Sequence, residues 1–192
     1  MWTSRNKKYI LFIIVLFICG IIGGLFFYQI LNTELQNILK TSINNFFLNI
    51  KNVEINFFIN HLLIMSFLIV SSFLIVGVFF NIIYIFYNGF IIGFIISIFS
   101  IVLGFKGFIF SIIYLIITKS IFLFFYLIFV LSSMKLSFSL IMIILKKNKC
   151  LSKYQSILVK RMIICFIIIN IVDFILYFWG NYLLNIFNFL VL

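Results

Sequence analysis

The sequence is poor in the residues from which catalytic sites are built. Its 192 residues include one histidine and three acidic residues. The acidic residues Glu34, Glu54 and Asp173 lie far apart in the sequence, so no paired-carboxylate site is indicated. The chain also has no HExxH, GxSxG or glycine-rich phosphate-binding motif, and one histidine leaves little material for a catalytic triad. The sequence therefore predicts a protein that is not an enzyme.

Cysteine and histidine are also too sparse to indicate a metal or redox site. Cys19, Cys150 and Cys165 are widely separated and match neither a zinc-binding nor a disulfide-exchange spacing. Ile18 stands where a lipoprotein signal would need a small residue, so we expect Cys19 to lie inside a membrane helix. His61 lies at a segment boundary, where we expect an interfacial polar residue and not a metal ligand. No cofactor is predicted.

Acidic residues are outnumbered by 14 lysines and arginines, which leaves a net charge of +11. These basic residues are spread along the ends of apolar segments and do not form a basic face interleaved with aromatic side chains, so we expect no nucleic-acid partner. Their placement fits the excess of Lys and Arg on the cytoplasmic loops of membrane proteins.

What the sequence has in abundance is apolar residues. They make up 66% of the chain, against about 45–50% in an ordinary soluble domain. A small soluble fold hides only about 70% of its surface and could not bury this much. We therefore expect one integral membrane domain over residues 1–192, built as an all-α bundle of transmembrane helices in contact with the lipid bilayer.

The first third of the chain suggests one crossing and one surface helix. Residues 9–31 follow a basic, acid-free N-terminus, are too long for a signal-peptide core and lack a cleavage site, which predicts an uncleaved helix entering from the cytoplasm. Residues 32–60 carry apolar side chains at helical spacing among Asn and Gln. We expect one or two amphipathic helices on the external membrane face, with a solvated loop as the alternative.

The middle of the chain is long enough for two crossings. Residues 61–104 would extend about 66 Å as a helix, against a hydrocarbon core of about 30 Å. We expect the reversal between them near Asn81 or near Tyr87–Asn88, where polar residues interrupt the apolar run.

Charge then sets the number of later crossings. The basic segment 146–161 has no acid and should share the cytoplasm with the N-terminus. Three crossings precede residue 105, so the next apolar run should cross once. We expect a re-entrant or interfacial half-helix at 108–118 and a full crossing at 121–145. A last crossing at 162–184 makes five, with the C-terminus external.

Small residues mark two places where helices can approach closely. Gly20 and Gly24 form a GxxxG pattern in the first helix, and Asn88-Gly89 is followed by Gly93 in the third crossing. We expect both as helix-packing faces, with ordinary membrane-helix glycines as the alternative.

Three polar side chains fall inside apolar segments. Asp173 and Asn170 share one face of the last helix, and Lys119 interrupts the long fourth run. A charge at the bilayer centre costs about 2.5–3.5 kcal/mol on insertion scales, so Asp173 should face protein or be protonated. We expect Lys119 and Asp173 to approach each other inside the bundle, either as a polar clamp or as part of an ion or proton path.

The middle of the chain resembles a known family. The sequence FYNGFIIGF at residues 86–94, the gap at Lys106-Gly107 and the long apolar run after it are similar to the stage II sporulation protein M family. The resemblance covers roughly residues 5–185. Family members carry a proline-containing break in the fourth segment, whereas this chain has Ile117–Ser120 there and no proline.

The resemblance implies a non-catalytic scaffold in the cell membrane. Members of this family hold two cell-wall hydrolases, the stage II sporulation proteins D and P, at the septum during engulfment. We expect contacts through residues 32–60 and through the two glycine faces. The alternative is the membrane subunit of a small transporter or exporter that uses Asp173 and Lys119. The sequence leaves open whether copies of the chain associate as a homo-oligomer.

Overall fold

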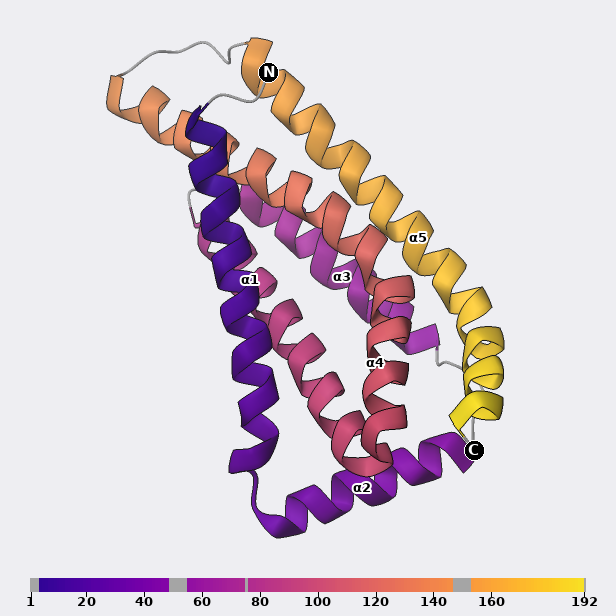
Figure 1. The fold of residues 1–192 in the computed structure, drawn as a ribbon. Helices are drawn as coiled ribbons and strands as arrows, with labels where there is room; N and C mark the ends of the chain where they lie inside the picture. Colours follow the sequence, from indigo (N-terminus) through magenta and orange to yellow (C-terminus); the bar gives the residue numbers. More distant parts are fainter. Residues whose placement is uncertain (1–3, 49–54, 75, 147–152, 192) are drawn as a thin grey trace.

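The computed structural model describes residues 4–48, 55–74, 76–146 and 153–191 of the chain. Within these ranges the backbone is helical apart from short turns and contains no strand, which confirms the expected all-α fold. Figure 1 shows the helices α1 (Ser4–Ile30), α2 (Thr33–Leu48), α3 (Ile55–Ser72), α4 (Gly77–Lys146) and α5 (Lys153–Val191).

Three of these helices contain stretches long and apolar enough to cross a membrane. The stretches are Lys7–Ile30, Gly77–Ile141 and Gln155–Trp179, and α3 holds a shorter apolar stretch, Ile59–Ser72. Large apolar side chains also cover the outside of the bundle, where Phe124 is 60% exposed. A surface this apolar suits lipid and not water, as expected for a membrane protein.

Helix α4 is divided by Gly104, which makes the chain double back (Figure 1). Gly104 has φ 64° and ψ −145°, a conformation open almost only to glycine. It separates a first limb (residues 77–103) from a second limb (105–146), so the long apolar stretch is two antiparallel helices joined at one residue.

The predicted position of the reversal before the first limb is wrong. The chain leaves the helix at Phe73, and Gly77 N donates to the carbonyl of Leu74 at 3.0 Å as α4 begins. Asn81 and Asn88 instead lie inside α4. The side-chain amide of each donates to the backbone carbonyl four residues earlier, at 2.8 Å. An asparagine amide satisfied in this way does not need to leave the helix.

The separate half-helix expected at 108–118 is also not found. Residues 105–146 form a continuous helix, and the Thr118 hydroxyl donates to the Tyr114 carbonyl at 2.8 Å. Thr118 is therefore accommodated in the helix. The second limb is longer than one straight crossing would need, and it bends and runs obliquely across the bundle (Figure 1).

Helix α2 lies across one end of the bundle (Figure 1). The Gln36 amide donates to the Leu31 carbonyl at 2.9 Å and the Tyr28 carbonyl at 3.2 Å, which satisfies the otherwise open end of α1 and fixes the turn. Ile43 packs against Phe110 of the second limb. The amphipathic helix expected within 32–60 is thus α2, and residues 55–60 already belong to α3.

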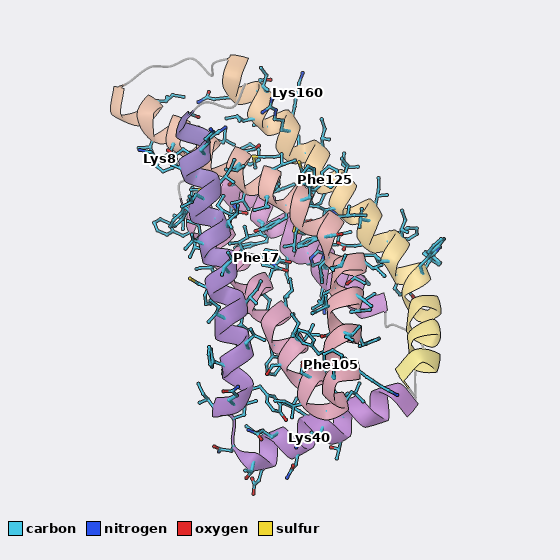
Figure 2. All side chains as sticks on the ribbon, in the orientation of Figure 1. Lys8, Phe17, Lys40, Phe105, Phe125 and Lys160 are labelled. Carbon is cyan, nitrogen blue, oxygen red and sulfur yellow. The ribbon has the colours of Figure 1, made fainter. Side chains whose placement is uncertain are left out.

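The two ends of the bundle differ in the elements they carry. Figure 2 shows Lys8 of α1 and Lys160 of α5 at one end, and Lys40 of α2 with Phe105 of α4 at the other. The main core lies between these ends, where α3, α5 and both limbs of α4 meet around Phe122, Tyr126 and Phe129.

Candidate functional site

Three helices bring polar side chains together inside the bundle. His61 of α3 places Nδ1 2.6 Å from Oδ2 of Asp173 on α5, and its Nε2 lies 2.9 Å from the Tyr84 hydroxyl on α4. The side chains of His61 and Asp173 are only 11% and 17% exposed. We call this group the Tyr84–His61–Asp173 cluster.

Aromatic rings of the second limb form a wall beside the cluster. The Phe122 ring centre lies 5.3 Å from that of His61, and the Tyr126 ring meets Tyr84 edge to face at 5.2 Å. Phe122 and Tyr126 are stacked on each other and almost fully buried. This packing holds the imidazole and phenol in place and limits the access of water.

The two ring nitrogens of His61 differ in their contacts. Nε2 shares a hydrogen bond with the Tyr84 hydroxyl at 2.9 Å. Nδ1 faces Oδ2 of Asp173 at ion-pair distance, but among the described residues neither of these two buried atoms has a partner in hydrogen-bond geometry. An unpaired polar atom is costly in such a region.

Lys119 lies beside the cluster but does not pair directly with its acid. Asp173 is close enough to attract the Lys119 ammonium electrostatically. The Lys119 Nζ lies 5.4 Å from the centre of the Phe122 ring, within the range of a cation–π contact. Among the described residues the ion-pair partner of Asp173 is His61. The lysine predicted as the partner is therefore an electrostatic neighbour of the pair.

The sequence interpretation missed His61. It predicted an interfacial residue, whereas the structure buries the imidazole against Asp173 and Phe122. The sequence feature that could have indicated the pairing is that the single histidine and the single aspartate of the chain both lie in or beside apolar segments. Asn170, one turn before Asp173, donates to the Phe166 carbonyl at 2.8 Å, so its amide closes on its own helix.

A second polar group links α3 to both limbs of α4. The Asn81 amide donates to the hydroxyls of Ser72 and Ser133, each at 3.0 Å, and Ser133 donates to Ser72 at 2.8 Å. The Tyr126 hydroxyl donates to the Asn81 carbonyl at 3.3 Å. The same tyrosine touches Tyr84, so polar side chains continue from the cluster toward the α3–α4 turn.

The predicted glycine faces meet each other. A side chain at Gly20 or Gly24 of α1 would collide with the backbone of Phe86 or Phe90 on α4. Reciprocally, Gly89 and Gly93 approach the backbone of α1, and all four glycines are buried. Asn88, beside this contact, bonds within α4. The two faces are thus occupied within the chain, which leaves neither free for a partner in this conformation.

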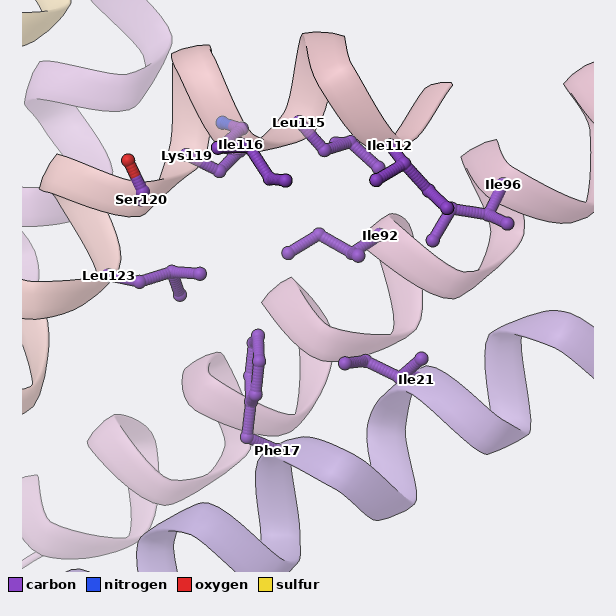
Figure 3. Close-up of a pocket in the computed structure, with 10 residues that line it drawn as sticks. All are labelled: Phe17, Ile21, Ile92, Ile96, Ile112, Leu115, Ile116, Lys119, Ser120 and Leu123. Carbon is purple, nitrogen blue, oxygen red and sulfur yellow. The ribbon is translucent and has the colours of Figure 1, made fainter. Parts of the chain in front are cut away.

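A cavity of about 240 Å³ lies between α1 and the two limbs of α4. Its wall is almost wholly aliphatic and aromatic, with Phe17, Ile92 and Leu115 among the lining residues (Figure 3). The polar ends of Lys119 and Ser120 point away from its centre in Figure 3, and Asp173 does not line it. The cavity is suited to apolar groups and not to an ion.

The search for a metal site and the comparisons with known proteins add no functional assignment. In the part of the chain that the structure describes, no three His, Cys, Asp or Glu side chains gather as a metal site would require. No family model, curated protein or solved structure matches the sequence at a significant level.

Proposed function

We propose that this chain is a non-catalytic scaffold of the cell membrane that recruits peptidoglycan hydrolases to the sporulation septum. The observation that carries the proposal is α2, a surface helix laid across one end of a packed bundle (Figure 1). The resemblance to the stage II sporulation protein M family supplies the class of partner.

The proposed topology has five crossings: α1, α3, the two limbs of α4, and α5. Lys8 and Lys160 share one end of the bundle (Figure 2), and the excess of basic residues assigns that end to the cytoplasm. The opposite end, which carries α2, then faces the cell wall, where the hydrolases act. In this topology the C-terminal end of α5 is external.

The exposed side of α2 suits a contact at the membrane surface. Glu34, Asn37 and Thr41 are exposed and recur at helical spacing on one face. Leu35 and Ile38, beside them, are 47% and 57% exposed. We propose that the apolar pair dips into the bilayer interface and that the polar face binds the hydrolases.

The proposal is tested by changing the polar face of α2 while leaving the bundle intact. The double variant Glu34→Lys/Asn37→Arg reverses the charge of that face, and Lys160→Gln serves as a control at the opposite end. We expect co-purification of the hydrolases to fall at least about tenfold in the α2 variant, equivalent to about 1.4 kcal/mol. Unchanged co-purification from correctly inserted protein would overturn the α2 contact.

A second candidate is the membrane subunit of a small transporter. It is favoured by the buried Tyr84–His61–Asp173 cluster with Lys119 beside it, because ionisable residues inside a membrane commonly mark transport pathways. This candidate requires substrate flux in reconstituted vesicles that Asp173→Asn abolishes. Co-purification of an ATPase in place of hydrolases would favour it over the scaffold.

A further inference from the structure

We propose that Lys135 of α4 and Arg161 of α5 together form a binding site for the phosphate of an anionic phospholipid. The scaffold function does not require this site. The site depends on the membrane location of the chain, but it holds whichever side of the membrane this end of the bundle faces. The occupant is a lipid and not a free anion, because apolar side chains continue from the basic pair toward the middle of the bundle.

The two basic residues lie where a hydrogen bond joins their helices. The second limb of α4 and α5 run antiparallel here (Figure 1). The amide of Gln155, which is 1% exposed, donates to the Ser139 hydroxyl at 2.9 Å. Lys135 lies one turn before Ser139 on the same face of α4, and Arg161 lies six residues after Gln155. Measured along the helices from this bond, the levels of Lys135 and Arg161 differ by about 3 Å.

The pair carries two like charges and lacks an acid to neutralise them. Lys135 and Arg161 are close enough to repel each other electrostatically. Among the described residues neither has a carboxylate partner, and the ion pair of this region's α5 helix joins Asp173 to His61. Asp173 is about 18 Å further along α5 than Arg161. A phosphate between the two side chains would relieve their repulsion through charge-assisted hydrogen bonds.

Both residues lie inside apolar stretches and not at their ends. Lys135 is six residues from the end of the Gly77–Ile141 stretch, about 9 Å. Arg161 is six residues from the start of the Gln155–Trp179 stretch, also about 9 Å. Lys and Arg at such positions extend their apolar stems toward the membrane surface. Their charged groups are thus directed to the level of the lipid phosphates.

An apolar surface continues from the basic pair toward the middle of the bundle. On α5, Ile164 lies one turn beyond Arg161 on the same face and is 55% exposed. On α4, Leu131 lies one turn before Lys135 and packs partly buried against the core. A phosphate bound by the pair would place the attached acyl chains along this surface. The charge and the apolar surface together therefore specify a phospholipid.

The test measures binding of dioleoylphosphatidylglycerol to the full chain in neutral detergent by native mass spectrometry. We expect Lys135→Gln/Arg161→Gln to bind this lipid at least about tenfold more weakly than the parent. The matched control Lys7→Gln/Lys8→Gln removes two charges from exposed positions at the same end of the bundle and should bind as the parent does. Dioleoylphosphatidylcholine, which has no net charge, should bind weakly to the parent and to both variants.

Thermal unfolding gives a second readout and checks that the variants fold. Without lipid, Lys135→Gln/Arg161→Gln should unfold at the same temperature as the parent or a higher one, because two repelling charges are gone. Added phosphatidylglycerol should raise the unfolding temperature of the parent and of Lys135→Arg/Arg161→Lys, which keeps both charges, much more than that of the Gln variant. Arg161→Gln alone, at an exposed position, should show an intermediate response.

Lipid binding that falls equally in Lys7→Gln/Lys8→Gln would overturn the proposal, because this end would then act only as a diffuse basic surface. Displacement of the lipid by inorganic phosphate at the same concentration would also overturn it, because the acyl chains would then contribute nothing. A folded Gln variant, double or single, that binds phosphatidylglycerol as tightly as the parent would be equally contrary. None of these results involves a hydrolase, so they leave the scaffold proposal standing.

Discussion

Asp173 and His61 illustrate how single residues are kept inside an apolar bundle. Nδ1 of His61 lies 2.6 Å from Oδ2 of Asp173, at ion-pair distance, and the Tyr84 hydroxyl is hydrogen-bonded to Nε2 on the other side of the imidazole. Removing one partner leaves the other buried without compensation, whereas replacing both with apolar residues removes the need for compensation.

We therefore expect His61→Leu to lower the free energy of unfolding in detergent by about 3 kcal/mol, the order seen when one member of a buried pair is lost. The double variant His61→Leu/Asp173→Leu should be more stable than this single variant. Thermal unfolding of the parent, His61→Leu, Asp173→Leu and the double variant forms a double-mutant cycle. Additive effects would show that the pair is not coupled.

The glycines of α1 provide a matched comparison at neighbouring positions. An added methyl group at Gly24 would run into the Phe90 carbonyl, whereas at Gly23 the nearest atom is in the Phe90 ring at 3.8 Å, an ordinary contact. We expect Gly24→Ala to lower the free energy of unfolding by about 1–3 kcal/mol. Gly23→Ala should change it little. Similar stabilities for the two variants would contradict the close α1–α4 approach.

At the scale of elements, the two limbs of α4 depend on one backbone conformation. A side chain at Gly104 would have open space around it, so substitution acts through φ and ψ alone. We expect Gly104→Ala to cost about 1–3 kcal/mol of unfolding free energy. Phe105→Ala, at a 77% exposed position in the same turn, is the control. Equal effects of the two substitutions would argue against the strained reversal.

Helix formation by the apolar runs was predictable, because their length and composition leave few other structures in a membrane. The reversals were predictable only in part. Asn81 and Asn88 look like breaks in the sequence but bond within the helix, so the first reversal was misplaced. The second was expected after residue 104, beside Lys106-Gly107, and the chain turns at Gly104. The glycine patterns predicted close helix packing, but the sequence did not show that the Gly20/Gly24 face would pack against the Gly89/Gly93 face.

The candidate site was predictable only in part for a similar reason. An acid inside an apolar helix must find a partner, and sequence offers several. Lys119 matches by charge, yet the arrangement of helices gives the ion pair to His61. Which candidate lies within reach depends on how α3, α4 and α5 cross, and no local pattern encodes that.

For the whole molecule, the proposed orientation can be tested at its two ends. Single cysteines replace Glu34 on α2 or Lys160 on α5 in a background without the native cysteines. We expect a membrane-impermeant thiol reagent applied to intact spheroplasts to label the Glu34→Cys variant and to reach the Lys160→Cys variant only after lysis. The reverse pattern would invert the topology, because the two positions lie at opposite ends of the bundle.

The reversal at Gly104 has a consequence for how the protein is made. With a single residue between the limbs, the chain offers no loop that could remain outside while one limb waits for the other. In the proposed five-crossing topology, the two limbs would therefore enter the bilayer together as a hairpin. In that case a tag inserted next to Gly104 would interfere with membrane insertion itself, and a protease added from the α2 end would find no segment to cut between them.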